Sequence, residues 1–204
     1  ARPCPSAYPL LMLPSHAAVV VAGGGAAGFM AAIAAAEAGV RDIVLLEATA
    51  EPLQKVLISG GGRCNVTHAC WDPRALVGHY PRGGQALRGP FSRFASGDAV
   101  AWFQEHGLEL EEEADGRLFP RSNRSESVAA TLRRAALQAG VQLFTGASLQ
   151  GAVVAAGGGF ALQVVGLHLG RAVPPGPAPR ASFSLAGISR TAALRLVPPF
   201  PGVT

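Results

Sequence analysis

A glycine-rich stretch between two apolar runs, residues 18–47, constrains the fold of this chain more than any other feature. It reads AVVVAGGGAAGFMAAIAAAEAGVRDIVLLE. The run Val19–Val21 is short and β-branched, which is typical of a buried parallel strand. Three glycines then follow at the spacing G-x-G-x-x-G: Gly23, Gly25 and Gly28. A helix and a second apolar strand, Ile43–Leu46, come next, so this order predicts a βαβ dinucleotide-binding unit.

Each part of this unit has a mechanical role. Gly23 permits a tight turn, Gly25 lets backbone approach a pyrophosphate, and Gly28 allows close helix–strand packing. The pyrophosphate would rest on the helix N-terminus, where unpaired N–H groups and the helix dipole favour negative charge. Glu47, at the end of the second strand, is predicted to accept hydrogen bonds from the adenosine ribose. No arginine follows Glu47 closely, which disfavours a cofactor with a 2′-phosphate.

The same stretch also allows a membrane-spanning helix, because residues 17–36 carry no charge over a length that could cross a bilayer. Three consecutive glycines in its middle argue against a packed spanning helix, and no basic cluster flanks either end. We therefore expect no membrane segment.

The composition places the chain among globular proteins. Of its 204 residues, 49% are hydrophobic and 15% are charged, which is enough apolar material for a core. The net charge of +4 is scattered, so it suits an anionic cofactor and does not indicate a nucleic-acid partner. We expect a small-molecule substrate, and the sequence does not indicate an oligomeric state.

A second glycine-rich segment, KVLISGGGRCN, runs from Lys55 to Asn65. Successive glycines such as Gly61 and Gly62 let backbone N–H groups point into one concavity, an anion nest, to which Arg63 adds a positive group. Lys55 could place another charge near a flavin or a phosphate. The alternative is an ordinary flexible surface loop. The position directly after a dinucleotide fingerprint favours the cofactor role.

Three cysteines do not make a disulfide framework and favour a reducing compartment: Cys4, Cys64 and Cys70. One alternative is a redox dithiol of Cys64 and Cys70 acting with a flavin, although the comparable pair of disulfide reductases has four intervening residues rather than five. Another is a metal site formed with His68, which lacks a clear fourth ligand. Structural cysteines, and no metal, are the favoured interpretation.

The rest of the chain predicts shorter elements. Residues 71–97 are rich in Pro and Gly and carry four arginines, so they are expected to form a solvated loop over the cofactor mouth rather than an RNA contact. Asp98 is expected to cap a helix that ends near His106. The later elements are a hairpin of 108–112 with 117–119, a helix over 125–139, a strand over 141–144, and a hairpin of 148–155 with 160–165.

This order predicts an α/β fold with a mixed sheet, in which a Rossmann-like dinucleotide-binding domain spans residues 17–166. Residues 1–16 are interpreted as a leader or transit-peptide remnant, 167–181 as a Pro-rich linker, and 182–204 as the first strands of an unfinished second domain. The expected location is the cytoplasm, or a plastid or mitochondrion if residues 1–16 derive from a transit peptide.

With these residues in view, the chain resembles the FAD-dependent oxidoreductases of the BaiN/YhiN type, also described as aminoacetone-oxidase-like flavoproteins. The matching segments are VAGGGAAGFMAA, KVLISGGGRCNVTH, HYPRGGQALRGPFSRF, AWFQEHGLELEEEADGRLFP and TGASL. The first is shared with many flavoproteins, whereas its combination with ISGGGRCN and DGRLFP is specific. The resemblance covers residues 18–165 well and 167–197 more loosely.

The resemblance implies a non-covalent FAD in a Rossmann domain of the glutathione-reductase type. Its pyrophosphate would lie on Gly23, Gly25, Ala26, Ala27 and Gly28, with the ribose on Glu47. Lys55 and the segment Gly61, Gly62, Arg63, Cys64 and Asn65 would lie along the cofactor, and the backbone of Leu149 would meet the adenine. Family members oxidise NAD(P)H or amines, so NAD(P)H is the implied reductant.

The resemblance also predicts a truncated member. In the family a further strand, ending in an Ala-Thr-Gly-Gly-like turn, follows the second hairpin, and a C-terminal segment closes over the flavin. Here Val165-Gly166 runs directly into LHLGRAVPPGPAP. We therefore expect an unpaired sheet edge beside Val19–Val21. Three functions stay open, with no catalytic base identified: a flavin oxidoreductase, an inactive nucleotide-binding remnant, and a dithiol reductase.

Overall fold

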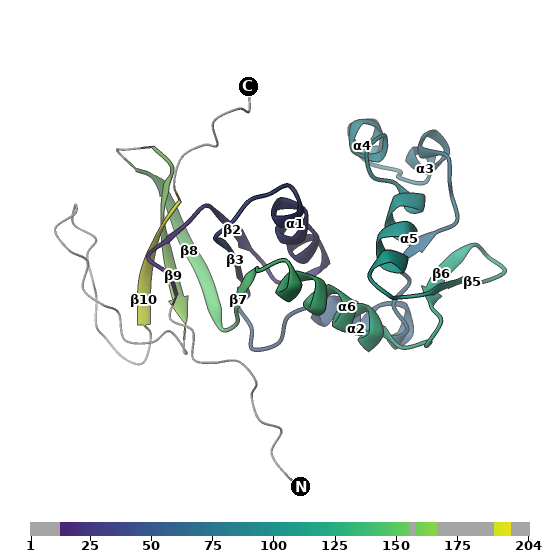
Figure 1. Ribbon diagram of the computed structural model, residues 1–204. Coiled ribbons are helices and arrows are strands. Elements are labelled where there is room, and N and C mark those ends of the chain that lie inside the picture. Colours follow the sequence, from purple (N-terminus) through teal and green to yellow (C-terminus); the bar gives the residue numbers. More distant parts are fainter. Residues whose placement is uncertain (1–12, 156–157, 167–189, 197–204) are drawn as a thin grey trace, which may run out of the picture. The chain divides into compact units, whose positions relative to one another are not determined.

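The computed structural model describes residues 13–155 and 158–166, together with the backbone of residues 190–196. The chain divides into two compact units (Figure 1). The first unit combines Ala1–Pro52 with Ala136–Thr204, and the second unit is Leu53–Ala135. Most of the predicted leader, linker and second domain lies outside the described residues, so those boundaries stay predictions.

A parallel sheet forms the centre of the first unit. Its strands are β2 (Val19–Ala22), β3 (Ile43–Leu46) and β7 (Gln142–Phe144), in the order β2-β3-β7. Both pairings are parallel, and helix α1 (Ala26–Glu37) connects β2 to β3. The predicted βαβ unit is therefore confirmed. Gly39 closes α1 with a φ of +91°, a conformation that glycine adopts without strain.

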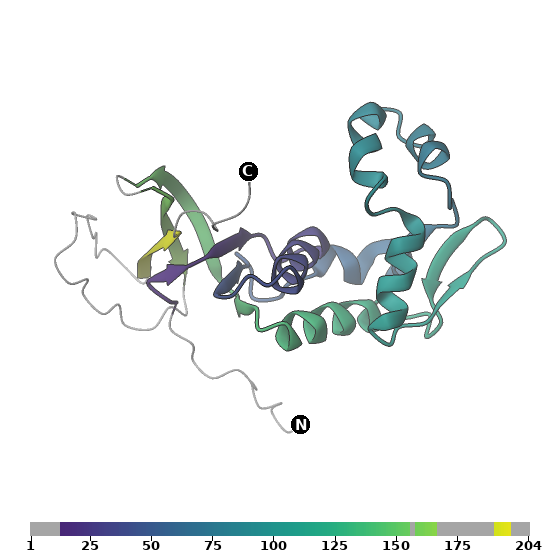
Figure 2. The ribbon, with the colours of Figure 1, turned by 45° about the horizontal axis from the view of Figure 1, so that its top comes forward.

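Every residue of the middle strand β3 is buried. Because side chains alternate along a strand, β3 is therefore covered on both faces of the sheet. Leu45 faces α1, which buries Phe29, Ala32, Ile33 and Ala36. Val44 and Leu46 face the opposite way and pack in one cluster with Leu162 and Val164 of the second sheet. The parallel sheet is thus covered by a helix on one face and by strands on the other (Figures 1 and 2).

The second sheet of this unit is mostly antiparallel. It contains β1 (His16–Ala17), β8 (Ala147–Val154), β9 (Phe160–Gly166) and β10 (Arg190–Leu196), in the order β1-β10-β9-β8. Strands β8 and β9 form the predicted hairpin. Strand β10, which the sequence assigned to the start of another domain, pairs antiparallel with β9 and parallel with β1.

Strand β2 lies at an edge of the parallel sheet, with β3 as its one strand neighbour among the described residues. Its valines are half-buried, whereas every residue of β3 is buried. The predicted open edge beside Val19–Val21 stays a prediction, because residues 167–175, where the completing strand is expected to be missing, lie outside the described residues.

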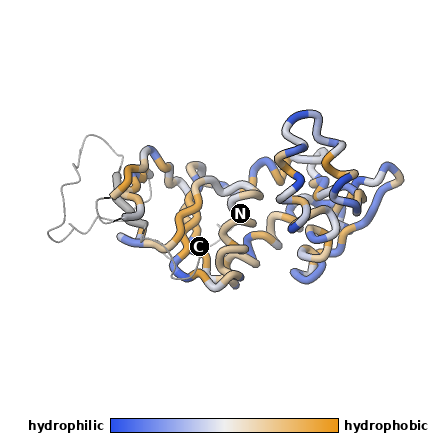
Figure 3. The backbone as a smooth tube through the Cα atoms, turned by 90° about the horizontal axis from the view of Figure 1, so that it is seen from above, coloured by the Kyte–Doolittle hydropathy of each residue, from blue (hydrophilic) through white to orange (hydrophobic). Residues whose placement is uncertain are grey.

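The second unit begins with α2 (Gln54–Ile58) and a 3-10 turn, η1 (Ser59–Gly62). Strands β4 (Thr67–His68), β5 (Leu110–Glu112) and β6 (Arg117–Pro120) form an antiparallel sheet in the order β4-β6-β5, which confirms the predicted hairpin. Helix α6 (Ser125–Gln138) begins where predicted, and Ser125 Oγ donates to the carbonyl of Leu57. Hydrophilic stretches dominate the tube of this unit, whereas the strands of the first unit are mostly hydrophobic (Figure 3).

The prediction of a loop over residues 71–97 was wrong, because this segment contains two helices. They are α3 (Pro73–Gly78) and α4 (Gly84–Phe91). Asp72 caps α3 by accepting the N–H of Arg74 at 2.9 Å, and Pro73 occupies the first helical position, where its missing N–H costs nothing. Pro and Gly are therefore compatible with helix here: Pro73 begins α3, and Pro90 lies inside α4.

Helix α5 (Ser96–Glu105) begins two residues before the predicted cap. Asp98 lies inside its first turn, where its carboxylate accepts the N–H of Ala95 at 2.8 Å. Among the described helices, none combines the length and apolar character needed to cross a membrane. The uncharged stretch 17–36 is instead a strand, a glycine loop and most of α1.

Candidate functional site

The first glycine loop, Gly23–Gly28, joins β2 to α1. Gly23 has a φ of +110° and donates its N–H to the carbonyl of Leu46 at 2.7 Å. Gly25 is the N-cap of α1, and no side chain caps the helix there. The first N–H groups of a helix have no helical acceptor, so those of Ala26 and Ala27 are available to an anion.

The glycines of this loop differ in how much space a side chain would have at each position. A Cβ on Gly28 would lie 1.9 Å from the carbonyl oxygen of Gly23, and one on Gly24 would lie 2.8 Å from Cβ of Glu47. A Cβ on Gly25 would meet nothing within 4 Å. Gly24 and Gly28 are therefore required by the protein's own packing. Gly25 borders open space at the helix N-terminus, where a pyrophosphate fits.

The Glu47 carboxylate is fixed beside this loop by three donors. Oε2 accepts the N–H of Gly24 at 2.8 Å, and Oε1 accepts both the N–H and the hydroxyl of Thr49 at 2.7 Å. Partial burial acts to raise the pKa of Glu47, but the hydrogen bonds from Thr49 and Gly24 outweigh it and lower the pKa below its ordinary value. Glu47 is therefore an ionised acceptor at neutral pH.

Leu149 lies in β8, the strand that begins next to Glu47. The N–H of Ala147 donates to the carbonyl of Glu47 at 2.8 Å, and the N–H of Gly146 donates to that of Thr49 at 2.8 Å. The pairing of β8 with β9 shifts register between Leu149 and Gly151, which is an irregularity of the bulge type. Leu149, the predicted adenine contact, thus lies two residues along β8 from Ala147, which bonds to the ribose acceptor Glu47 within the same unit.

The second glycine turn, residues 59–65, has an unusual backbone. Gly60, Gly61 and Gly62 have φ values of +56°, +69° and +83°, and Cys64 follows at +62°. The N–H groups of Arg63 and Cys64 converge on one acceptor, the carbonyl oxygen of Ser59. These two donors therefore bind the chain itself and form no anion nest, while Gly61 and Gly62 border open space.

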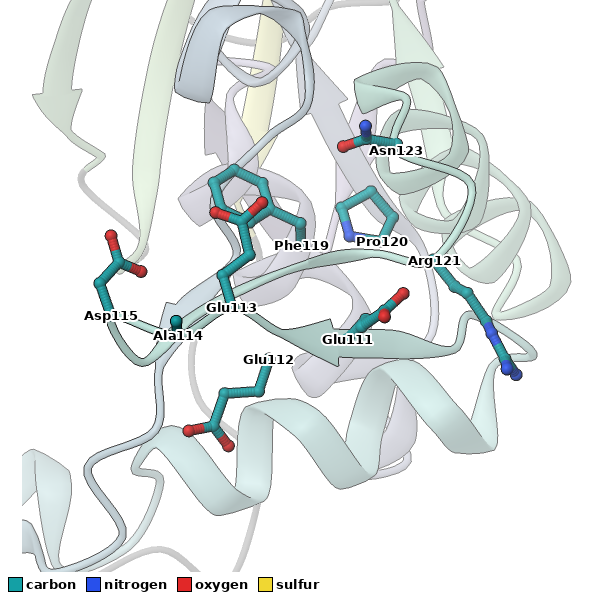
Figure 4. Close-up of a pocket in the computed structure, with 9 residues that line it drawn as sticks. All are labelled: Glu111, Glu112, Glu113, Ala114, Asp115, Phe119, Pro120, Arg121 and Asn123. Carbon is teal, nitrogen blue, oxygen red and sulfur yellow. The ribbon is translucent and has the colours of Figure 1, made fainter.

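Arg63 does not project freely from this turn. Its guanidinium pairs with the carboxylate of Glu113 and lies 3.9 Å from the ring centroid of Phe119. A longer contact, 3.4 Å, reaches the side-chain oxygen of Asn123. Glu113 and Phe119 flank one hollow of about 710 Å³, in which the Glu113 carboxylate lies beside the ring (Figure 4). The expected free positive fork is therefore already neutralised.

The remaining predicted residues of the second unit are Lys55 and Asn65. Both are exposed. In the orientation that satisfies its amide, Asn65 donates to the carbonyls of Thr67 and Leu118. The structure describes the two units separately, so the expected line of Lys55 and residues 61–65 along a cofactor bound at Gly23–Gly28 stays a prediction.

The cysteines fit a structural role. Cys64 is buried, and Cys64 and Cys70 are both free thiols. Burial raises the pKa of the Cys64 thiol, which disfavours the thiolate that a redox dithiol needs. Within the described residues, no three His, Cys, Asp or Glu side chains come together to hold a metal, so Cys64, His68 and Cys70 do not form the site that their spacing allowed.

Several residues that shape the site were missed from the sequence. Thr49 fixes the ribose acceptor, while Glu113 and Phe119 hold Arg63. Thr49 lies two residues from Glu47, so a hydroxyl just after the strand-end acid was a usable signal. Glu113 is 50 residues from Arg63, and nothing local in the sequence indicates their pairing.

Comparison with known proteins agrees with this geometry. The family model for the HI0933-like protein Rossmann domain matches residues 17–169. A 3-dehydro-bile acid delta(4,6)-reductase of Clostridium scindens is 31% identical over 132 residues, which are 64% of this chain and 31% of that protein. A ribosomal RNA dihydrouridine synthase of Escherichia coli is 32% identical over 92 residues, which are 45% of this chain and 22% of that protein.

Among solved structures, the open conformation of a flavocytochrome c3 fumarate reductase matches with a TM-score of 0.60 and 19% identity, covering 89% of this chain and 32% of that one. At this identity the match shows a shared fold. The chain spans 31% and 22% of the length of the two curated relatives. Since the family model covers most of the chain, the protein belongs to the HI0933-like family, and residues 17–169 are its Rossmann domain.

Proposed function

We propose that this chain is the FAD-binding part of a flavin-dependent oxidoreductase. The observation that carries the proposal is the open space at Gly25, which adjoins the uncapped N-terminus of α1. A diphosphate placed there meets backbone N–H groups and the positive end of the helix dipole. Gly24 and Gly28 pack tightly against protein, whereas Gly25, like Gly23, borders open space where backbone can approach the cofactor.

Glu47 supplies the ribose end of the same site. A carboxylate has about four acceptor positions. Three are used by Gly24 and Thr49, two of them on Oε1 and one on Oε2. Oε2 accepts only one of these three hydrogen bonds, so the ribose hydroxyl would bind there. An ionised Glu47 also repels a 2′-phosphate, which favours FAD or NAD over NADP as the resident dinucleotide.

The two sequence relatives suggest the reaction class. One is named for reducing the Δ4,6 double bonds of a 3-dehydro-bile acid, and the other for making dihydrouridine in ribosomal RNA. Both names describe adding hydrogen across a carbon–carbon double bond conjugated to a carbonyl. Bound FAD supplies hydride-transfer chemistry of this kind. We propose NAD(P)H as the reductant, and a small molecule as substrate because the bile-acid reductase aligns over more of the chain.

The test is flavin binding by the full chain. We expect the purified protein to quench FAD fluorescence on titration and to show flavin absorbance, while Gly25→Val loses at least tenfold in affinity because its side chain fills the diphosphate position. Gly89→Val is the matched control, since a Cβ at Gly89 also meets nothing within 4 Å. Gly25 has a φ of −83°, which valine adopts readily, so the variant should keep the wild-type melting temperature.

Two results would contradict the proposal. One is a wild-type chain that binds NADPH but no FAD. The other is a folded Gly25→Val variant that binds FAD as tightly as the wild type. Oxidation of NADH or NADPH with an artificial electron acceptor then separates a working oxidoreductase from a protein that only binds the nucleotide.

A further inference from the structure

We propose that Glu113 and Phe119 are positioning residues that hold Arg63 and thereby preset the second glycine turn for the flavin. The inference rests on the proposed FAD binding. Both residues belong to the β5–β6 hairpin region, and all of the contacts lie within the second unit. In this arrangement Arg63 acts through the turn backbone and is not itself a phosphate ligand.

The first support is that the Arg63 guanidinium is both paired with a carboxylate and stacked on a ring. It pairs with the Glu113 carboxylate, and the two side chains are 32% and 37% exposed, so the pair is partly shielded from solvent. Its other contact is the face of Phe119, with 3.9 Å between Cζ and the ring centroid. Stacking on a ring and pairing with a carboxylate together fix the plane of an arginine more firmly than either contact alone.

The second support is the backbone that these contacts enclose. Cys64 has a φ of +62°, a strained conformation for a residue with a side chain. Strain of this kind persists when the surroundings enforce it. Arg63, directly before Cys64, is held by Glu113 and Phe119, and Asn65, directly after, is held through the carbonyl of Leu118.

The third support is that one side of the turn is packed and the other is open. A Cβ on Gly60 would lie 3.0 Å from Cε1 of Phe119 and 2.8 Å from the backbone nitrogen of Asn65. Cβ atoms on Gly61 and Gly62 would meet nothing within 4 Å. The hairpin therefore supports the Gly60 side, which leaves the backbone of Gly61 and Gly62 as the surface that a flat ligand can approach.

The sign of one substitution separates this role from direct phosphate binding by Arg63. If Glu113 holds the turn, Glu113→Gln weakens FAD binding. If Glu113 merely competes with a phosphate for Arg63, the same variant strengthens it. We expect about fivefold weaker binding, in line with a partly exposed ion pair. Arg63→Gln should show a similar loss, and the Arg63→Gln/Glu113→Gln double variant should lose no more than either single variant.

Glu112→Gln is the matched control. Glu112 is next to Glu113 in the sequence, and its own carboxylate makes no hydrogen bond or ion pair found among the described residues. FAD affinity is measured by fluorescence quenching on the full chain, with the melting temperature without FAD recorded for each variant. Arg63→Lys keeps the charge but loses the fork and the stacking, so it should bind FAD no better than Arg63→Gln. Tighter or unchanged binding by Glu113→Gln, or additive losses in the double variant, would overturn the proposal.

A second measurement tests the holding contact without any flavin. In hydrogen exchange followed by mass spectrometry, peptides covering residues 60–65 should exchange about fivefold faster in Glu113→Gln than in wild type, and at the wild-type rate in Glu112→Gln. Equal exchange rates in all three proteins would refute the proposal that Glu113 holds the turn. A wild-type chain that binds no FAD would instead refute the proposed function, so the two failures are distinguishable.

Discussion

Glu47 has a structural task in addition to its proposed role toward the ribose. Its carboxylate joins the end of β3 to the first glycine loop through the N–H of Gly24. Thr49 holds the other oxygen, so the side chain is already oriented without a ligand. A site arranged in this way loses less conformational freedom when a ligand binds, which favours affinity.

The lowered pKa of Glu47 predicts a pH-dependent stability. A carboxylate with a depressed pKa in the folded protein stabilises it fully above the unfolded value, about 4.3 for glutamate, and that contribution is lost as the pH falls through the folded pKa. Glu47→Gln should therefore have a lower melting temperature than the wild type at pH 7. Near pH 3 the melting temperatures of the two proteins should be close. An equal difference at both pH values would show that the ionised form contributes nothing.

At the level of single residues, the first site could be predicted and the second could not. Gly23, Gly25, Gly28 and Glu47 are fixed by the geometry of one βαβ unit, so their spacing in the sequence specifies their places in space. Arg63 depends on Glu113, which is 50 residues away, and a pairing of that kind leaves no local pattern. The acceptor of the Arg63 and Cys64 N–H groups could not be predicted either, because glycine content does not reveal that Ser59 supplies it.

At the level of elements, the longer strands and helices were predicted, whereas the short helices and the two-residue strands β1 and β4 were missed. Apolar periodicity identified β2, α1 and β3 because tertiary packing uses that same pattern. Helices α3 and α4 are short and rich in Pro and Gly, residues that also mark loops. Asp72-Pro73 was the available signal, since a capping residue followed by proline commonly begins a helix.

The first turn of α5 provides a prediction at this scale. The Asp98 carboxylate accepts the N–H of Ala95 and lies at the positive end of the helix. Asp98→Ala should destabilise the protein by about 1 kcal/mol, through the lost cap and the lost dipole interaction. Glu105→Ala is the control, because an acid in the last turn gains nothing from the dipole. Equal unfolding free energies for wild type and Asp98→Ala in urea denaturation would contradict the capping role.

At the scale of the whole molecule, β2 is an edge strand, with β3 as its one strand neighbour among the described residues. Gly23, directly after β2, donates its N–H to the carbonyl of Leu46 in β3. Because successive N–H groups alternate in direction along a strand, those of Val19 and Val21 also point toward β3, and that of Val20 points away from it. An edge of this kind can pair with another strand.

The exposed edge predicts an alternating pattern of amide exchange. The amide of Val20 should exchange faster than those of Val19 and Val21, by a factor of about ten or more, when followed by NMR in dilute solution. Val19 and Val21 are the internal controls, since they lie in the same strand with their N–H groups toward β3. Equal protection at all three positions would mean that another segment or another molecule pairs with this edge.

The crowding around Gly24 restricts which sequences this family's fold can explore. A Cβ at that position would collide with two atoms of Glu47, at 2.8 and 2.9 Å, and with Pro52 at 3.1 Å. In a combinatorial library randomised at positions 24, 47 and 52, residues larger than glycine at position 24 should be recovered together with shorter residues at position 47. Retargeting the site to a phosphorylated ribose, which begins with replacing Glu47, would thereby also release position 24, so the two changes have to be selected as a pair rather than one after the other.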